Sequence, residues 1–297
     1  MNLNYRITKA AFFALLMGLA VTSCQKLERP VLKELILDPD PPAYSDLKAF
    51  WSFENNVTDA GESKFTGTAT NISYVPGVTG QAAKIGAGGY LLVPGSDVVT
   101  YPNGFIGKGG DTLTSLGSYT LAFWMNGVGP VDGGAQGLFA ISNKAEFWGN
   151  LELFLENDNN AADQSEAFLK VHMFNAGVAS GNGEEWNEVK IPGALNKWTH
   201  IAVTYNAATS MFSIYANGAP TAIANKVLGG GNYGKLKFKN FNGMVLGTYQ
   251  FQTTPSLTTN HGNETWARSF NGALDQFRIY NRALSPTEIN DLYTTKK

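Results

Sequence analysis

Short runs of alternating apolar and polar residues, each followed by a turn signal, constrain this fold more than any other feature. In residues 119–125, Tyr119, Leu121, Phe123 and Met125 share one face of a strand. The same period of two recurs in residues 151–156, 199–205 and 211–216. Asn217-Gly218 follows the last run and is a strong β-hairpin signal. This spacing predicts an all-β fold, a sandwich or a jelly roll.

Composition supports a β fold and excludes several classes of protein. Of 297 residues, 33 are glycine, 12% are aromatic and only 15% are charged, which suits a turn-rich, weakly charged β protein. The net charge of −2 gives no basic footprint, so we expect no nucleic-acid partner. A single cysteine excludes a disulfide framework and a Cys-rich zinc site.

One helix is predicted, close to the C-terminus. Ser285-Pro286-Thr287-Glu288 combines an N-cap serine, a proline at the first helical position and a glutamate that completes a capping box. Ile289, Leu292 and Tyr293 then share one face at helical spacing. We therefore expect a short C-terminal helix that packs on the sandwich.

Residues 1–23 have the pattern of a signal peptide. Arg6 and Lys9 precede an apolar run over residues 10–21, which spans ~18 Å as a helix, short of the ~30 Å hydrocarbon core of a membrane. The run ends beside Cys24, the single cysteine, and resembles the lipobox of bacterial lipoproteins, in which the cysteine is lipidated. An ordinary secretory signal with a chance cysteine is the alternative.

Residues 24–46 contain Pro30, Pro39, Pro41 and Pro42, and Pro-rich chain stays extended. We expect a tether here, between a lipid anchor in the membrane and a folded domain over residues 47–297. Gln25 follows the cysteine, which resembles outer-membrane sorting in Gram-negative bacteria. The expected location is the outer membrane of the cell envelope, and exposure at the cell surface stays open.

Five segments in order resemble the motifs of laminin G-like, concanavalin A-like domains: residues 49–59, 78–94, 118–124, 197–218 and 272–284. The resemblance implies a two-sheet antiparallel jelly-roll sandwich with a short C-terminal helix and, often, glycan binding. The same fold also carries hydrolases, lyases and adhesive modules, so it does not fix the function. The resemblance further implies a structural calcium ion held by Glu54, Asp59 and Asp275. The alternative for Asp275 is a carboxylate that accepts backbone N–H groups of the Glu54 loop.

Two glutamates of residues 151–156, Glu152 and Glu156, share a strand face, a placement similar to that of laminarinase-type glycoside hydrolases. Phe154 stands where their central aspartate would be, which argues against that class. If residues 168–175 pair with this strand, Lys170 and His172 become neighbours of the two glutamates. We expect His200 to be structural, and His261 has no spaced partner for a metal site.

Aromatic residues in polar surroundings are the candidate ligand contacts. Trp148, Trp186, Trp266 and Tyr249 lie in predicted loops. Trp186 ranks first because its neighbours, Glu184, Glu185 and Asn187 among them, are almost all polar or glycine and offer it little core. A flat ring suits the C–H face of a sugar, and the polar neighbours suit its hydroxyls. The alternative is that each ring anchors a loop to the rim of the sandwich.

The sequence therefore predicts a non-catalytic carbohydrate-binding lipoprotein whose partner is a glycan or polysaccharide. Two alternatives stay open: a glycan-cleaving hydrolase or lyase on the same fold, and an adhesin or structural module that binds protein partners.

Overall fold

A computed structural model describes residues 46–61, 63–95, 117–130, 134–157, 165–178 and 183–296, all in one compact unit, Ser45–Lys297. The predicted signal peptide, Cys24 and nearly all of the tether lie outside the described residues. Among the residues described, no helix has the length and apolar character needed to cross a membrane.

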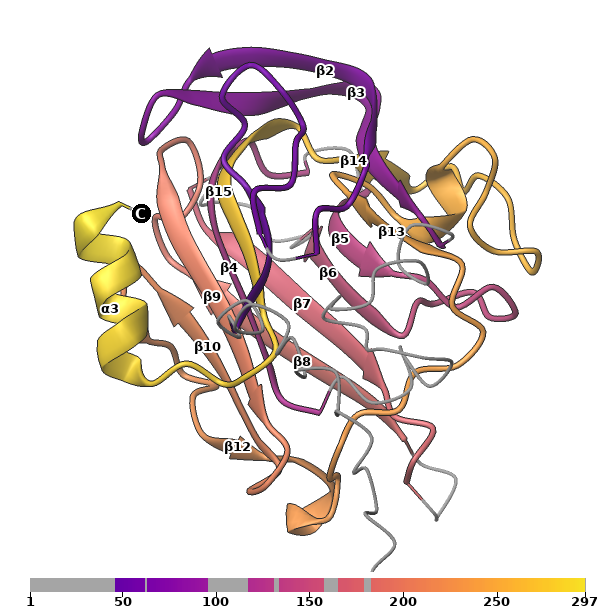
Figure 1. The fold of residues 1–297 in the computed structure, drawn as a ribbon, viewed down its shortest axis with the longest axis vertical. Helices are drawn as coiled ribbons and strands as arrows, with labels where there is room; N and C mark the ends of the chain where they lie inside the picture. The colour runs from indigo at the N-terminus through magenta and orange to yellow at the C-terminus, as the bar shows by residue number, and fades with distance from the viewer. Residues whose placement is uncertain are drawn as a thin grey trace, which may run out of the picture. The chain divides into compact units, whose positions relative to one another are not determined.

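The described residues form fifteen strands, two 3-10 turns and one α-helix (Figure 1). The strands are β1 (Leu47–Trp51), β2 (Thr68–Pro76), β3 (Gln81–Pro94), β4 (Tyr119–Gly127), β5 (Ala135–Ile141), β6 (Leu151–Glu156), β7 (Ala167–Phe174), β8 (Glu184–Ile191), β9 (Thr199–Asn206), β10 (Met211–Ala216), β11 (Ala219–Pro220), β12 (Lys226–Val227), β13 (Gly243–Leu246), β14 (Ala267–Ser269) and β15 (Gly272–Tyr280). The 3-10 turns are η2 (Leu228–Gly231) and η3 (Gln250–Gln252), and the helix is α3 (Pro286–Thr295).

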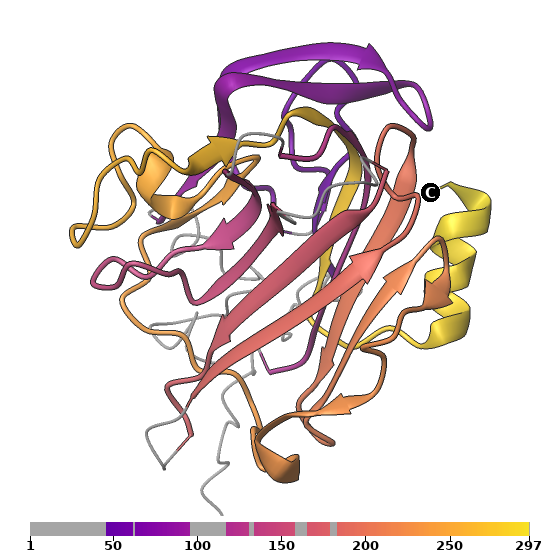
Figure 2. The same ribbon diagram turned by 180° about the vertical axis from the view of Figure 1, so that it is seen from behind.

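The strands pair into one curled sheet in the order β11-β10-β9-β4-β15-β3-β13-β5-β6-β7-β8 (Figures 1 and 2). Its two halves face each other across the hydrophobic core, so the hydroxyl of Tyr119 on β4 reaches Sδ of Met173 on β7 at 3.1 Å. The predicted jelly-roll sandwich is confirmed, with two refinements. The layers are continuous through β3 and β13, and β14 pairs with β5 in parallel.

Period-two alternation explains which side chains enter the core. On β6 the leucines Leu151, Leu153 and Leu155 are buried in the core, while Glu152 and Phe154 alternate with them on the outer face. The hydrophobic effect fixes this register, because a shift of one residue would exchange the two faces.

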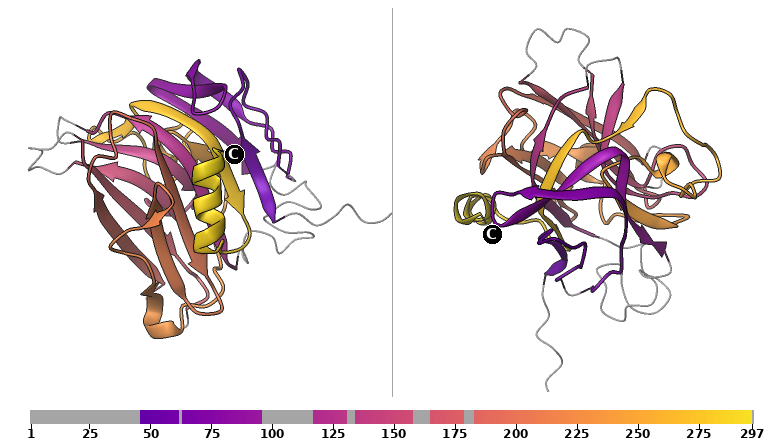
Figure 3. Two further views of the ribbon diagram at one scale, coloured as in Figure 1. Left: turned by 90° about the vertical axis from the view of Figure 1, so that its left-hand side faces the viewer. Right: turned by 90° about the horizontal axis from the view of Figure 1, so that it is seen from above.

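Helix α3 has the predicted start. The Ser285 side chain accepts a hydrogen bond from the Glu288 N–H, and the Glu288 side chain accepts one from the Ser285 N–H, which completes the capping box. Ile289 is fully buried and packs with Ala122 of β4 and Ala202 of β9. The helix therefore covers part of the outer face of the β4–β9–β10 half-sheet (Figure 3).

Candidate functional site

The outer face of β6, β7 and β8 carries a row of paired side chains in direct register. Glu152 lies opposite His172, and His172 lies opposite Trp186. In the next row, Phe154 lies opposite Lys170, which faces Glu188. The pairing of β6 with β7 that the sequence suggested is therefore present. It places Lys170 and His172 beside the two glutamates of β6.

A cleft of about 460 Å³ opens on this face. We call it the aromatic cleft, and it is lined by Trp148, Phe154, Glu156, Lys170, Trp186 and Trp266. Three of these are tryptophans that the sequence singled out. They come from the loop before β6, from β8 and from the turn before β14.

The rings of the aromatic cleft support one another. Trp148 stacks on Phe154 with centroids 5.7 Å apart and meets Trp186 edge-on at 5.2 Å. Trp266 lies 6.1 Å from Trp148. Edge-to-face and offset contacts at these distances are favourable. Trp186 is 40% exposed, so one large ring stays open to solvent at the mouth of the cleft.

The loop that carries Trp148 is fixed from beneath by Gln250. Its Nε2 donates to the carbonyls of Glu146 and Phe147 at 2.9 and 2.7 Å, and its Oε1 accepts from the Asn143 N–H at 2.7 Å. Phe147 also stacks on Phe251 with centroids 4.6 Å apart. These contacts hold the Trp148 loop in place without a ligand, so the position of Trp148 is preorganised.

Charge in the aromatic cleft is balanced at Lys170. Its Nζ lies 3.3 Å from Oε2 of Glu156 and 3.4 Å from Oε2 of Glu188. Lys170, the one cation among the described residues that line the cleft, is thus held between two carboxylates. Polar donors and acceptors stand beside the rings without an excess of positive charge.

Two titratable groups lie buried behind the rings. Burial lowers the pKa of His172, an effect opposed by Glu184, whose Oε1 lies 3.1 Å from Nε2. Burial raises the pKa of Glu152 to about 8, opposed only in part by the N–H groups of Gly149 and Gln250. These two N–H groups act at longer range or poorer angles, and neither Glu152 oxygen makes a hydrogen bond of ordinary geometry among the described residues. Because Glu152 is 1% exposed, only Glu156 of the two β6 glutamates faces the cleft.

Four of the predicted ligand residues are placed differently by the structure. Trp186 belongs to strand β8, and not to a loop, so its immediate neighbours Glu185 and Asn187 point to the opposite side of the sheet. There Asn187 is buried and accepts a hydrogen bond from Lys226. Tyr249 is 1% exposed and packs behind Phe154. Glu184 remains on the face of Trp186.

The three predicted calcium ligands have different surroundings. Asp59 accepts backbone N–H groups from Phe50, Gly61 and Phe65 at 2.7–2.9 Å, so its oxygens are already used. Among the described residues no group of three or more His, Cys, Asp or Glu side chains is arranged to hold a metal ion. The expected set of three is therefore not brought together.

Glu54 and Asp275 both hold the turn between β2 and β3. Glu54 accepts the Gln81 N–H at 3.0 Å, and Oδ2 of Asp275 accepts from the N–H groups of Val78 and Thr79. The alternative for Asp275 expected backbone N–H partners, but in the Glu54 loop and not in this turn. Burial raises the pKa of Asp275 to about 6, and Glu54 adds to the shift. Its buried Oδ1 has no partner among the described residues, which suits a cation ligand. Calcium at Glu54 and Asp275 stays a prediction.

The other two histidines lie apart from any chemistry at the cleft. His200 is 2% exposed, and burial lowers its pKa to about 3, which fits the structural role expected for it. His261 contacts the Phe147 ring at 4.4 Å and lies 3.2 Å from Glu264.

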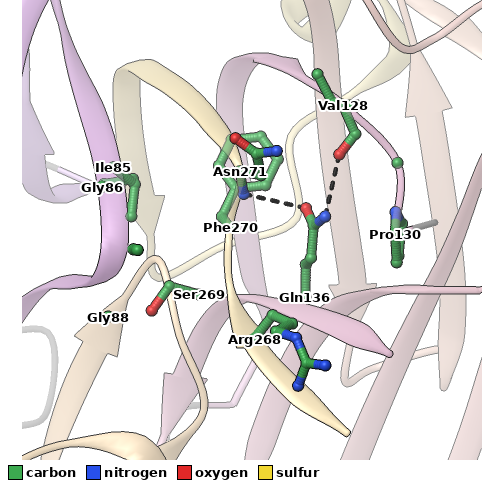
Figure 4. A pocket seen from close by; sticks show the side chains of 12 residues that line it. Ile85, Gly86, Gly88, Val128, Pro130, Gln136, Arg268, Ser269, Phe270 and Asn271 are labelled. Atoms are coloured by element: carbon green, nitrogen blue, oxygen red, sulfur yellow. Dashed lines mark hydrogen bonds between the residues drawn. The ribbon is translucent and has the colours of Figure 1, made fainter. Parts of the chain in front are cut away.

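A separate hollow of about 370 Å³ lies beside β14 (Figure 4). Its buried polar side chain, Gln136, donates to the Val128 carbonyl and accepts from the Asn271 N–H. Because both ends of this amide serve the backbone, we assign no ligand to the hollow.

Comparisons with known proteins identify the fold. Residues 95–290 match the family model of the concanavalin A-like lectin/glucanases superfamily. No curated protein matches the chain. Among solved structures, domain 4 of AbnA, a GH43 extracellular arabinanase from Geobacillus stearothermophilus in complex with arabinotriose, is 19% identical with a TM-score of 0.50. That match covers 83% of this chain and 98% of that one.

Two toxin structures are also similar. One is a botulinum neurotoxin type C structure whose title ties cell entry to interaction with two ganglioside molecules (14% identity, TM-score 0.55, 84% of this chain and 51% of that one). The other is the binding domain of Paraclostridial Mosquitocidal Protein 1 (15%, 0.54, 84% and 52%). The match spans about half of each toxin chain. Because the family model covers more than half of the sequence, the chain belongs to the concanavalin A-like lectin/glucanases superfamily.

Proposed function

We propose that this protein is a non-catalytic carbohydrate-binding lipoprotein of the bacterial cell envelope, and that the aromatic cleft is its binding site. The observation that carries the proposal is the convergence of Phe154, Trp186 and Trp266 on Trp148 around one cleft. Segments far apart in the sequence supply these rings, and the cleft is built before a ligand binds.

The chemistry of the cleft suits a sugar. A pyranose or furanose ring offers an apolar C–H face to an aromatic ring and hydroxyls at its edge, and binding sites combine apolar walls with a few placed polar groups. Trp186 supplies an accessible ring, and Glu156 and Lys170 supply an acceptor and a donor at the end of the cleft. The similar structures were solved with, or described by, arabinotriose and gangliosides, which supports a glycan as the ligand here.

Hydrolysis is disfavoured by the same geometry. Glycoside cleavage uses two carboxyl groups on either side of the scissile bond. In the described residues the cleft has one lining carboxylate, Glu156, while Glu152 is 1% exposed and does not line it. The envelope location rests on Cys24 and the lipobox-like sequence before it. Lipid anchoring there would hold the binding domain at the outer membrane.

A glycan array with the chain from residue 25 onward tests the proposal. Trp186→Ala should weaken binding to any retained glycan about thirtyfold, because loss of an aromatic anchor costs ~2 kcal/mol or more. The melting temperature should change little, since this ring is 40% exposed. Tyr74→Ala, a half-buried aromatic on β2, is the matched control and should keep binding. The proposal would be rejected if Trp186→Ala bound glycans as well as wild type does, or if wild type bound a protein partner and no glycan.

A further inference from the structure

A second cavity, about 650 Å³ in volume, lies where helix α3 ends. We call it the C-terminal hollow. Its lining includes Trp124, Lys197, Trp198, Asn217, Tyr293 and Lys296. The turn between β2 and β3 closes one side, and Figure 1 shows that turn beside the C-terminal end of α3. The Thr79 hydroxyl donates to the Lys296 carbonyl at 3.0 Å and joins the two segments.

The inner wall of the C-terminal hollow holds a buried donor. Trp124 is 4% exposed, and its Nε1 has no hydrogen-bond partner among the described residues. Tyr293 stacks on the Trp124 ring with centroids 5.6 Å apart and an interplanar angle of 29°. A buried indole N–H without an acceptor is costly unless water or a ligand oxygen pairs with it.

The rim of the C-terminal hollow is positive. Lys197 and Lys296 line it, both exposed, and no acidic side chain is among the described lining residues. At the end of α3 the Thr79 hydroxyl donates to the Lys296 carbonyl, while the hydroxyls of Thr294 and Thr295 donate to the carbonyls of Asn290 and Asp291 one turn earlier. The last carbonyls of α3 add partial negative charge here, and the two ammonium groups are the charged side chains among the described lining residues.

Asp275 does not reverse this balance. It lies behind the turn, fully buried, where Oδ2 is engaged by the N–H groups of Val78 and Thr79. The contrast with the aromatic cleft is direct, since Lys170 there is neutralised by two carboxylates. The protein thus carries two aromatic recesses of different charge.

We propose that the C-terminal hollow is a second binding site, and that its ligand is an acidic sugar bearing a carboxylate or a sulfate. Trp198 and Tyr293 supply ring surface for the sugar, and Lys197 and Lys296 pair with its anionic group. The Trp124 N–H finds its acceptor in a ligand oxygen. This inference goes beyond the proposed function, because the cleft of Trp186 takes no part in it.

The test is an array of neutral, uronate-bearing and sulfated glycans probed with the chain from residue 25 onward. Wild type should retain acidic glycans. Lys197→Gln/Lys296→Gln should bind them about tenfold or more weakly, as expected when charged hydrogen bonds are lost. Trp186→Ala should still bind the acidic glycans. It should be the only variant that no longer binds a neutral glycan recognised by the aromatic cleft.

Lys144→Gln/Lys235→Gln removes the same charge from exposed positions outside the C-terminal hollow and is the matched control. Its acidic binding should stay within about twofold of wild type, which separates the site from a general effect of net charge. If wild type binds none of the acidic glycans on the array, the inference is overturned. Equal weakening in the two double variants would also overturn it. If only the binding of neutral glycans is lost, the result concerns the aromatic cleft and does not contradict the second site.

Discussion

Glu152→Gln should make the stability of this protein markedly less sensitive to pH. In the folded state Glu152 is covered by the Trp148 loop and has a pKa of about 8, against an ordinary value of 4.5, because burial penalises the carboxylate. The folded state therefore binds this proton more tightly than the unfolded state. The contribution of Glu152 is most favourable below pH 4.5, falls as the pH rises, and levels off above about 8.

The size of the effect follows from the two pKa values. A difference of about 3.5 between 4.5 and 8 corresponds to ~5 kcal/mol of lost stability at pH 9, an upper value because water entry would relieve part of it. Glutamine has nearly the same shape and no charge. Relative to wild type, Glu152→Gln should unfold with a similar free energy at pH 4 and with ~3–5 kcal/mol more at pH 9.

Urea unfolding followed by tryptophan emission at pH 4, 7 and 9 measures this difference. Glu188→Gln, an exposed carboxylate on the same face, should track wild type within about 0.5 kcal/mol. Asp275 has a raised pKa and titrates with the same sign, so only the gap between variant and wild type is diagnostic. A gap that stays constant from pH 4 to pH 9 would refute the burial argument for Glu152.

Two further predictions concern the calcium ion and the lipid anchor. If calcium binds at Glu54 and Asp275, chelator should lower the melting temperature, since a ligand at a hundredfold excess over Kd stabilises by ~2.7 kcal/mol; Asp275→Asn should abolish that sensitivity, and identical melting curves with chelator and with calcium would end the idea. Cys24→Ala should release the protein from the membrane fraction or block signal processing, and unchanged membrane association in fractionated cells would contradict the lipobox assignment.

Strand alternation and capping chemistry made most of the fold predictable. The apolar face of residues 151–156 and the Ser285 capping box are local signals, and the structure contains both as expected. The parallel pairing of β14 with β5 was not predictable, because it joins segments more than 130 residues apart without a local signal. Closure of the sheet through β3 and β13 is likewise a tertiary result.

The binding face was predictable in its residue types but not in its assembly. Glycines near residue 180 suggested a loop, yet Val189 and Ile191 continue a period of two that already put Asn187 on the core side and Trp186 outside. Tyr249 is polar at its tip but packs behind Phe154, a contact that no local pattern announces. Trp198 lies in residues 197–218, which the sequence predicts to form strands. Its contribution to the C-terminal hollow depends on the fold and was not predictable from that segment.

The aromatic cleft gives the protein an intrinsic optical reporter. Three of its six tryptophans stand within one small volume, and Trp148 meets Trp186 almost perpendicularly, at 84°. Indoles this close couple electronically, so near-ultraviolet circular dichroism should carry a strong signature from this one region. A sugar stacked on Trp186 would exclude water from an exposed indole and shift its emission to shorter wavelength. Occupancy of the cleft is thus readable without a label, in the same sample that reports unfolding.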